Sequence, residues 1–109
     1  MSDLYFNLRM ASKQFERQSK KSEKEQAKQR LKVKQALEKG NVEAARIHAS
    51  NAIRLGNEAN NFLRLSSRLD AAASRVKQAE MMNTVAKTLG SVVKGLDKAL
   101  ETLDTEKLE

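Results

Sequence analysis

Proline, cysteine and tryptophan are absent from this sequence of 109 residues, which has only one tyrosine and three phenylalanines. Without cysteine there is no disulfide, no thiolate nucleophile and no zinc site that needs sulfur. The lack of proline argues against a β-sandwich or barrel, whose many turns usually contain it. So few aromatic residues, beside 32% charged residues, argue against a thick globular core. The sequence therefore predicts an all-α, elongated protein whose helices bury a narrow stripe.

Long apolar runs are missing as well. No segment approaches the roughly 18 consecutive apolar residues that a membrane-spanning helix needs, so we expect no membrane span. The first ten residues mix Ser2, Asp3 and Arg9 with apolar residues, which is unlike a signal peptide. Together with the absence of cysteine, this predicts a reducing, cytoplasmic location, where the protein is still able to bind a membrane surface.

Gly40 and Asn41 mark the clearest turn. Glycine suits the left-handed position that ends a helix, and asparagine is a preferred N-cap of the next one. Residues 3–38 contain neither glycine nor proline. We therefore predict an antiparallel helical hairpin with a helix over about 3–38, a turn at 39–41 and a longer helix over about 42–105. The alternative is a chain that folds back again near Gly90 and Gly95, where glycine weakens the second helix.

Basic side chains gather on one side of the first predicted helix. Residues 1–39 hold 11 basic and five acidic residues, whereas residues 40–109 hold ten and nine, so most of the net charge of +7 lies on the first helix. At 100° per residue, the opposite side carries Leu4, Leu8, Ala11, Phe15, Val33, Ala36 and Leu37. Between Phe15 and Val33 this side is polar but uncharged. The basic side predicts a polyanionic partner, either lipid headgroups or nucleic acid.

The second predicted helix changes character along its length. Small residues come first, at Ala45, Ala49, Ala52, Gly56 and Ala59, and they permit a close approach of the first helix. The first helix is long enough to reach only about residue 77. The larger apolar residues from Met82 to Leu103 are left without an intrachain cover, which predicts a partner, self-assembly or a missing piece of chain. Because no helix-stop residues precede Glu109, we expect the sequence to be a fragment.

No constellation of catalytic residues is present. His48 is the single histidine, there is no cysteine for it to activate, and the serines have no nearby base. The glycines are isolated and form no phosphate-binding loop. We therefore expect no enzyme, no cofactor and no metal site, and we interpret His48 as a partly buried polar contact.

One long stretch resembles a known family. The run of residues 45–54, ARIHASNAIR, resembles the signature of the charged multivesicular body protein 1 family, which belongs to the ESCRT-III membrane-remodelling subunits. Further similarities extend over essentially the whole chain, at Phe6–Leu8, Lys20–Lys21, Gly40–Asn41, Asn61–Asp70, Arg75–Val76, Val92–Lys94, Leu96–Asp97 and Glu106–Lys107.

The resemblance implies a basic first helix paired with a longer second helix in a subunit that alternates between a closed monomer and an open filament. It implies cytoplasmic proteins that bind endosomal membranes peripherally and act in multivesicular body formation and cytokinetic abscission. The partners implied are anionic lipids, further copies, and other ESCRT-III subunits including the increased-sodium-tolerance-1 protein. A disassembly ATPase is implied only where a C-terminal motif, beyond residue 109, is present.

Two sets of candidate residues follow. The resemblance assigns membrane binding to the cations Arg9, Lys13, Arg17, Lys20, Lys24 and Lys28. Packing or self-assembly is expected from the apolar residues Phe62, Leu69, Val76, Val85, Leu89, Val92 and Leu96. Two alternatives remain open, namely a helical hairpin that binds nucleic acid through the same cations, and a coiled-coil scaffold in which the basic side has no ligand.

Overall fold

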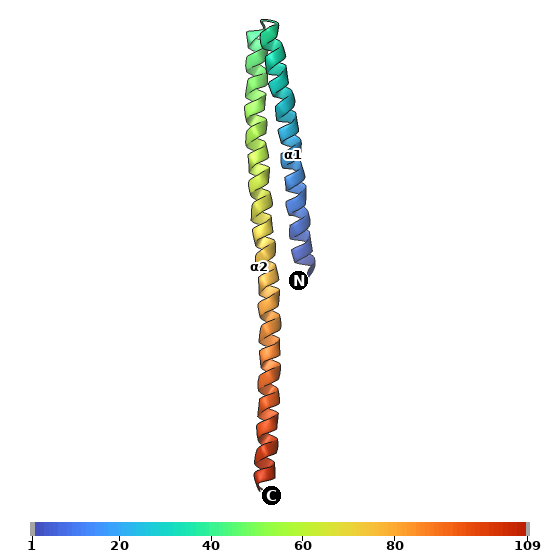
Figure 1. Ribbon diagram of the computed structural model, residues 1–109, viewed down its shortest axis with the longest axis vertical. Coiled ribbons are helices and arrows are strands. Elements are labelled where there is room, and N and C mark those ends of the chain that lie inside the picture. Colours follow the sequence, from blue (N-terminus) through green and yellow to red (C-terminus); the bar gives the residue numbers. More distant parts are fainter. Residues whose placement is uncertain (1, 109) are drawn as a thin grey trace.

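Two antiparallel helices make up the described chain. The computed structural model describes residues 2–108, with α1 over Ser2–Glu38 and α2 over Val42–Leu108 (Figure 1). They contain 37 and 67 residues, and the molecule measures 105 × 15 × 13 Å. This confirms the predicted elongated hairpin, in which α2 projects far beyond the N-terminal end of α1. The alternative with a fold-back near Gly90 and Gly95 is wrong, because α2 is one continuous helix there.

The turn between the helices is closed by backbone hydrogen bonds. Gly40 has a φ of 74°, a left-handed conformation that favours glycine. Its N–H donates to the Leu37 carbonyl at 3.0 Å, and the Asn41 N–H donates to the Ala36 carbonyl at 2.8 Å. This pair of bonds is the Schellman motif, which satisfies carbonyls at the end of α1. Asn41 then caps α2, since its Oδ1 accepts from the Ala44 N–H at 3.0 Å.

The two helices meet along a single seam with coiled-coil periodicity. Buried and half-buried residues recur at alternating steps of three and four residues on both helices, the spacing of an antiparallel coiled coil. On α1 these residues are Tyr5, Leu8, Ser12, Phe15, Ser19, Ser22, Gln26, Gln29, Val33 and Ala36. On α2 they are Ala45, His48, Ala52, Leu55, Ala59, Phe62, Ser66, Leu69, Ala73 and Val76.

Small residues at every seventh position of α2 let the helices approach closely. All five are buried, with exposed fractions of 0–7%: Ala45, Ala52, Ala59, Ser66 and Ala73. Gly56 belongs to the same contact, since a Cβ added there would lie 2.5 Å from the Gln26 Nε2 atom. The small-residue stripe predicted from the sequence is therefore the surface on which α1 packs.

Several seam positions are polar, and hydrogen bonds across the seam satisfy two of the buried serines on α1. The Ser12 hydroxyl donates to the Ser66 carbonyl at 2.9 Å, and the Ser19 hydroxyl donates to the Ala59 carbonyl at 2.8 Å. These hydroxyls are buried, so leaving one without a partner would cost about 1–3 kcal/mol. The serines therefore act as packing residues and also hold the two helices in register.

Larger side chains pack in the seam on both sides of the contact between Ser12 and Ser66. The rings of Phe15 and Phe62 stack with centroids 6.0 Å apart, and Lys77 Nζ lies 5.7 Å from the centre of the Tyr5 ring. Leu4 and Leu37, expected on the buried side of α1, are instead 51% and 57% exposed. Each lies next to a seam position, because the seam of a coiled coil contains only two positions of every seven.

We predict that Ala59→Leu lowers the free energy of unfolding by about 1–3 kcal/mol, because three additional carbons have no space between the helices. Urea unfolding followed by circular dichroism measures the change. Ala71→Leu is the matched control on the exposed side of α2 and is expected to change stability by less than about 0.5 kcal/mol. Equal effects of the two substitutions would contradict the close packing described here.

Candidate functional site

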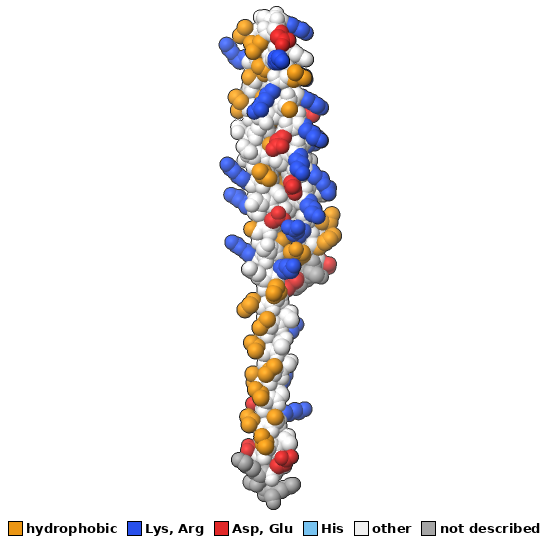
Figure 2. Space-filling model, viewed as in Figure 1, with side chains coloured by type: hydrophobic (Ala, Val, Ile, Leu, Met, Phe, Trp, Pro, Cys, Tyr) orange, Lys and Arg blue, Asp and Glu red, His pale blue; other side chains and the backbone are white. Residues whose placement is uncertain are grey.

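The predicted lipid-binding cations form one exposed stripe on α1. All six are exposed and follow one another at steps of three or four residues: Arg9, Lys13, Arg17, Lys20, Lys24 and Lys28. At 1.5 Å per residue this stripe, here called the basic face, is about 28 Å long. At 100° per residue it winds about 100° around α1 over that length. In the space-filling view, Lys and Arg side chains line the α1 edge of the hairpin (Figure 2).

Local ion pairs leave the basic face accessible. Lys20 Nζ lies 3.9 Å from Glu16 Oε1, and Lys28 Nζ lies 3.3 Å from Glu25 Oε1. The two lysine side chains are nevertheless 71% and 68% exposed, and surface pairs of this kind contribute at most about 1 kcal/mol. No ion pair with a described residue is formed by Lys13, Arg17 or Lys24. The basic face is therefore available to a polyanion along most of its length.

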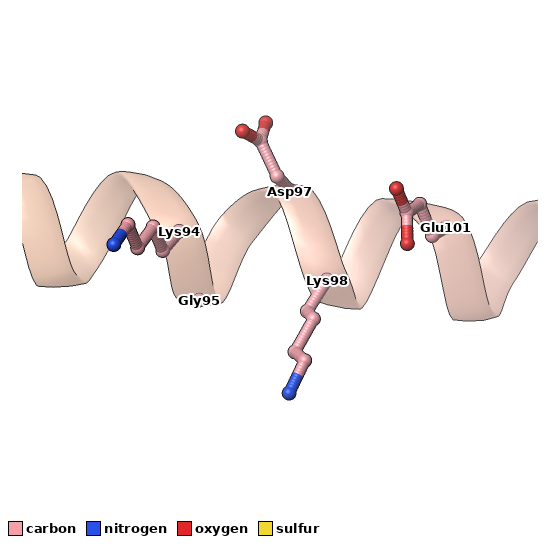
Figure 3. Close-up of a pocket in the computed structure, with 5 residues that line it drawn as sticks. All are labelled: Lys94, Gly95, Asp97, Lys98 and Glu101. Carbon is pink, nitrogen blue, oxygen red and sulfur yellow. The ribbon is translucent and has the colours of Figure 1, made fainter.

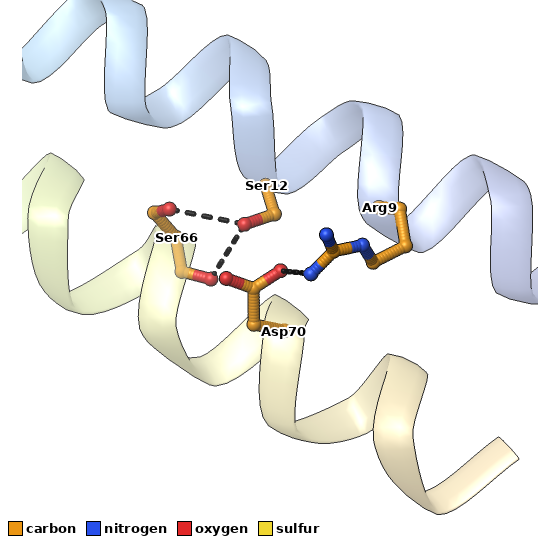
Figure 4. Close-up of polar contacts among 4 residues, drawn as sticks. All are labelled: Arg9, Ser12, Ser66 and Asp70. Atoms are coloured by element: carbon orange, nitrogen blue, oxygen red, sulfur yellow. Dashed lines mark hydrogen bonds and ion pairs between the residues drawn. The ribbon is translucent and has the colours of Figure 1, made fainter. Parts of the chain in front are cut away.

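Arg9 differs from the other five cations because it contacts α2. Its guanidinium Nη1 lies 2.9 Å from Asp70 Oδ1, one turn from the contact between Ser12 and Ser66 (Figure 4). The two charged side chains are 45% and 47% exposed, so solvent screens the pair. Arg9 thus joins the helices near the open end of the hairpin, and an anion that binds Arg9 competes with Asp70.

A second group of cations lies on α2 and was not predicted as a site. It consists of exposed arginines: Arg46, Arg54, Arg64, Arg68 and Arg75. Blue side chains on the edge of the hairpin opposite α1 are visible in Figure 2. The net charge of α2 is close to zero, because its acidic residues nearly balance its basic ones. The net charge of each helix therefore does not reveal this group of arginines. One member, Arg54, is paired with Glu58 at 3.0 Å.

Beyond the hairpin, the exposed side of α2 carries a continuous apolar stripe. The seam positions of α2, continued past Val76, fall on polar residues such as Asn83, Lys87 and Lys94. The apolar residues come one or two positions earlier, which places them about 150° around the helix from the seam. This distal stripe contains Met82, Val85, Leu89, Val92, Leu96, Ala99 and Leu103. It is visible as orange side chains along the lower part of α2 (Figure 2).

The distal stripe is wide and free of charge. Val93 and Leu100 lie beside it and are 56% and 59% exposed. All charged residues between positions 81 and 103 lie on the other side of α2, namely Lys87, Lys94, Asp97, Lys98 and Glu101. A single partner helix covers two positions per heptad, whereas here four of seven positions are uncharged. The stripe therefore has room for more than one neighbouring helix.

The candidate packing residues fall into two groups. Phe62, Leu69 and Val76 lie half-buried in the seam, where they contact α1 and are covered within this chain. The other four are 49–60% exposed in the distal stripe: Val85, Leu89, Val92 and Leu96. Only the second group is accessible to another molecule in this hairpin.

His48 forms the polar contact that the sequence predicted. Its Nδ1 lies 2.8 Å from Gln29 Oε1, which also accepts a weak hydrogen bond from Asn51 Nδ2 at 3.5 Å. The ring is part-buried in the seam, and no group of three metal-ligating side chains occurs among the residues that the structure describes.

Two further observations concern surfaces. Neither helix, over the described residues, combines the length and apolar character needed to cross a bilayer. A shallow hollow beside Gly95 is lined by Lys94, Asp97, Lys98 and Glu101, but these side chains point away from one another around a single helix (Figure 3). They do not converge on a common ligand position, so this hollow is not a candidate site.

Comparison with known proteins relates the chain to one family. A family model described as Snf7 matches residues 6–109. Charged multivesicular body protein 1 of Dictyostelium discoideum is 46% identical over 108 residues, which are 99% of this chain and 56% of that protein. Charged multivesicular body protein 1a of Danio rerio is 50% identical over 108 residues, 99% of this chain and 54% of that protein.

A plant protein gives a similar result. The ESCRT-related protein CHMP1 of Oryza sativa subsp. japonica is 48% identical over 103 residues, which are 94% of this chain and 50% of that protein. The chain thus spans about half the length of the curated relatives it matches.

We predict that two contacts at the open end of the hairpin respond differently to salt. Asp70→Asn is expected to lower the free energy of unfolding by less than about 1 kcal/mol, and by less still at about 1 M salt, because its ion pair with Arg9 is solvent-exposed. Ser12→Ala is expected to cost about 1 kcal/mol at either salt concentration, because it removes a buried hydrogen bond. Urea unfolding at both concentrations measures the two changes, and a salt-dependent Ser12→Ala effect would contradict this assignment.

Proposed function

Because the chain belongs to the Snf7 family, we propose that it is a filament-forming ESCRT-III subunit that binds anionic membranes through the basic face of α1 and takes part in membrane remodelling. The names of its relatives suggest multivesicular body sorting as the cellular setting. The observation that carries the proposal is the basic face, an exposed stripe of cations of which all but Arg9 are turned away from α2. The role is structural and involves no catalysed reaction.

The basic face is strong enough to bind a membrane surface when several copies act together. A basic side chain near an anionic bilayer contributes about 1 kcal/mol. Five cations of the basic face are not engaged with α2, which corresponds to about 5 kcal/mol for one copy. This is modest for a monomer, but assembly multiplies it, since each further copy binds at a high effective concentration.

The distal stripe supports assembly with further copies of the chain. Helical stripes as wide as this one are covered in stable proteins, and α1 is too short to reach it. Because it lies about 150° from the seam, a partner is able to bind without displacing α1. Contact between this stripe and a different surface of the next copy is heterologous, and repeated heterologous contacts form filaments when they do not close into a ring.

The proposal extends to partners and location. We infer that the protein is cytoplasmic and binds endosomal membranes peripherally. Other ESCRT-III subunits, including the increased-sodium-tolerance-1 protein, are its proposed co-assembly partners, and cytokinetic abscission is a further proposed setting. A disassembly ATPase is a partner only of a longer chain that contains the C-terminal binding motif.

We predict that the triple reversal Lys20→Glu, Lys24→Glu, Lys28→Glu abolishes cosedimentation with phosphatidylserine vesicles. Loss of three cations at about 1 kcal/mol each corresponds to at least about 100-fold weaker partitioning, and the new negative charges add repulsion. Circular dichroism should show unchanged helicity, because the three side chains are exposed.

The matched control is Lys87→Glu, Lys94→Glu, Lys98→Glu, which makes the same change in net charge on the distal part of α2. We expect this control to sediment with vesicles as the unchanged protein does. Equal losses in the two variants would mean that net charge, and not the basic face, determines binding. Displacement of vesicles by duplex DNA at about 0.15 M salt would favour the nucleic-acid alternative.

We predict that Leu89→Asp with Leu96→Asp prevents self-association while the hairpin remains folded. Each substitution places a charge in the uncharged band, where a packed neighbour would have to bury it. Sedimentation velocity and negative-stain images with anionic vesicles measure assembly. Asn83→Asp with Ser91→Asp is the control on the charged side of α2, and we expect normal assembly. Filaments of unchanged length from the leucine variant would exclude the distal stripe as an assembly contact.

A further inference from the structure

A separate cluster of polar and basic groups lies at the closed end of the hairpin. An open cavity of about 210 Å³ lies between α1 and the start of α2 there. It is lined by Lys32, Gln35, Ala36, Lys39, Asn41, Ala44 and His48. None of these residues belongs to the basic face or to the distal stripe.

The charge around this cavity is entirely positive. Lys32 lies in the last turns of α1, and Lys39 directly follows Glu38, the last residue of that helix; both line the cavity. Both are exposed, and neither forms an ion pair with a described residue. No acidic residue is among those that line the cavity. An anion bound between the two ammonium groups would relieve their mutual repulsion.

His48 adds a ring nitrogen from the second helix. The Gln29 Oε1 atom is an acceptor, so the His48 Nδ1 atom at 2.8 Å donates to it. The ring is thereby oriented, and its Nε2 atom, which is an acceptor in the neutral ring, donates to an anion only when both ring nitrogens carry a proton.

Neutral amides complete the set of donors. The Oδ1 atom of Asn41 caps Ala44, which leaves the Asn41 Nδ2 group as a donor beside the cavity. Gln35 carries a second amide on the cavity wall. The Ala44 N–H is already satisfied by Asn41 and is not available to a ligand.

We propose that this cavity binds a phosphomonoester group, with Lys32 and Lys39 neutralising its charge, the amides of Gln35 and Asn41 donating to its oxygens, and the His48 ring lying beside it. A phosphomonoester carries a charge of about −1.5 to −2 and three acceptor oxygens, which suits donors that approach from several directions. A planar carboxylate is matched best by the fork of an arginine, and no arginine lines the cavity. The phosphate is either part of a free solute or the headgroup of a phosphoinositide.

Nuclear magnetic resonance provides a direct test, because His48 is the only histidine in the chain and its ring signals are unambiguous. Inorganic phosphate is titrated into the protein at fixed pH and at an ionic strength held constant with sodium chloride. We expect saturable shifts of the His48 ring signals. In Lys32→Ala with Lys39→Ala, the apparent Kd for phosphate should rise by at least about tenfold, since two charge-assisted contacts are lost.

Lys87→Ala with Lys94→Ala is the matched control, because it removes two exposed lysines at the same spacing that belong to neither the cavity nor the basic face. This variant should retain the phosphate response of the unchanged protein. A response that does not saturate, that survives in the Lys32 and Lys39 variant, or that is lost equally in the control would overturn the proposal. Circular dichroism verifies that all variants keep their helicity, so a lost response reports on the cavity and not on folding.

Vesicles distinguish the two sources of the phosphate group. Phosphatidylcholine vesicles containing phosphatidylinositol 4-phosphate are compared with phosphatidylserine vesicles of equal surface charge. If removal of Lys32 and Lys39 weakens binding selectively to the phosphoinositide vesicles, the occupant is a lipid headgroup. If vesicle binding is unchanged while the response to inorganic phosphate is lost, the occupant is a free phosphorylated solute. Neither result depends on the assignment of the basic face, which is tested with different residues.

Discussion

Close packing of α1 on the small residues of α2 is the constraint on which the rest of the structure depends. A buried alanine or serine at every seventh position of α2 lets the two helices approach closely along one seam. Once that side of α1 is occupied, its rotation is determined, and the lysines of the basic face lie on the exposed side. A helix with larger residues at these positions would be held further from α1, with fewer contacts between them. The exposure of the cations is therefore a consequence of how α2 packs.

The seam is unusual in using hydrogen bonds where a coiled coil ordinarily uses leucine. Ser12 contacts Ser66, Ser19 contacts the Ala59 carbonyl, and Gln29 contacts His48. The contacts between side chains, Ser12 with Ser66 and Gln29 with His48, form in one register of the hairpin only. Sliding α1 by a heptad would separate these side chains, whereas the serine hydroxyls would again face backbone carbonyls of α2, as Ser12 and Ser19 do one heptad apart. The polar seam thus contributes less to stability than an apolar one of the same area, but it specifies alignment.

The apolar residues of α2 change from one side of the helix to the other along its length. The residues that stabilise the hairpin therefore differ from those exposed for assembly. Up to Val76 the seam residues of α2 face α1, and from Met82 onward the apolar residues lie on nearly the opposite side. The apolar side changes at the level of α2 that lies beside the first residues of α1. Beyond that level α2 has no partner helix within the chain. As a result, the residues that stabilise the hairpin and those exposed for another molecule do not compete. One continuous helix presents two interaction surfaces on different sides of its axis.

Helical periodicity is a local property, so the two helices, the turn at Gly40, the basic side of α1 and the apolar stripe that α1 does not reach were all predictable from the amino-acid sequence. The position of a side chain relative to another helix is not local, and the tertiary structure alone decided it. The packed helices placed Leu4 and Leu37 outside the seam, paired Arg9 with Asp70, and formed an open cavity lined by Lys32, Lys39 and His48. Burial of Ser12 and Ser19 also depends on the alanines and serine of α2 that face them. Polar residues carry no hydrophobic signal, so only the packed pair of helices reveals that they are buried.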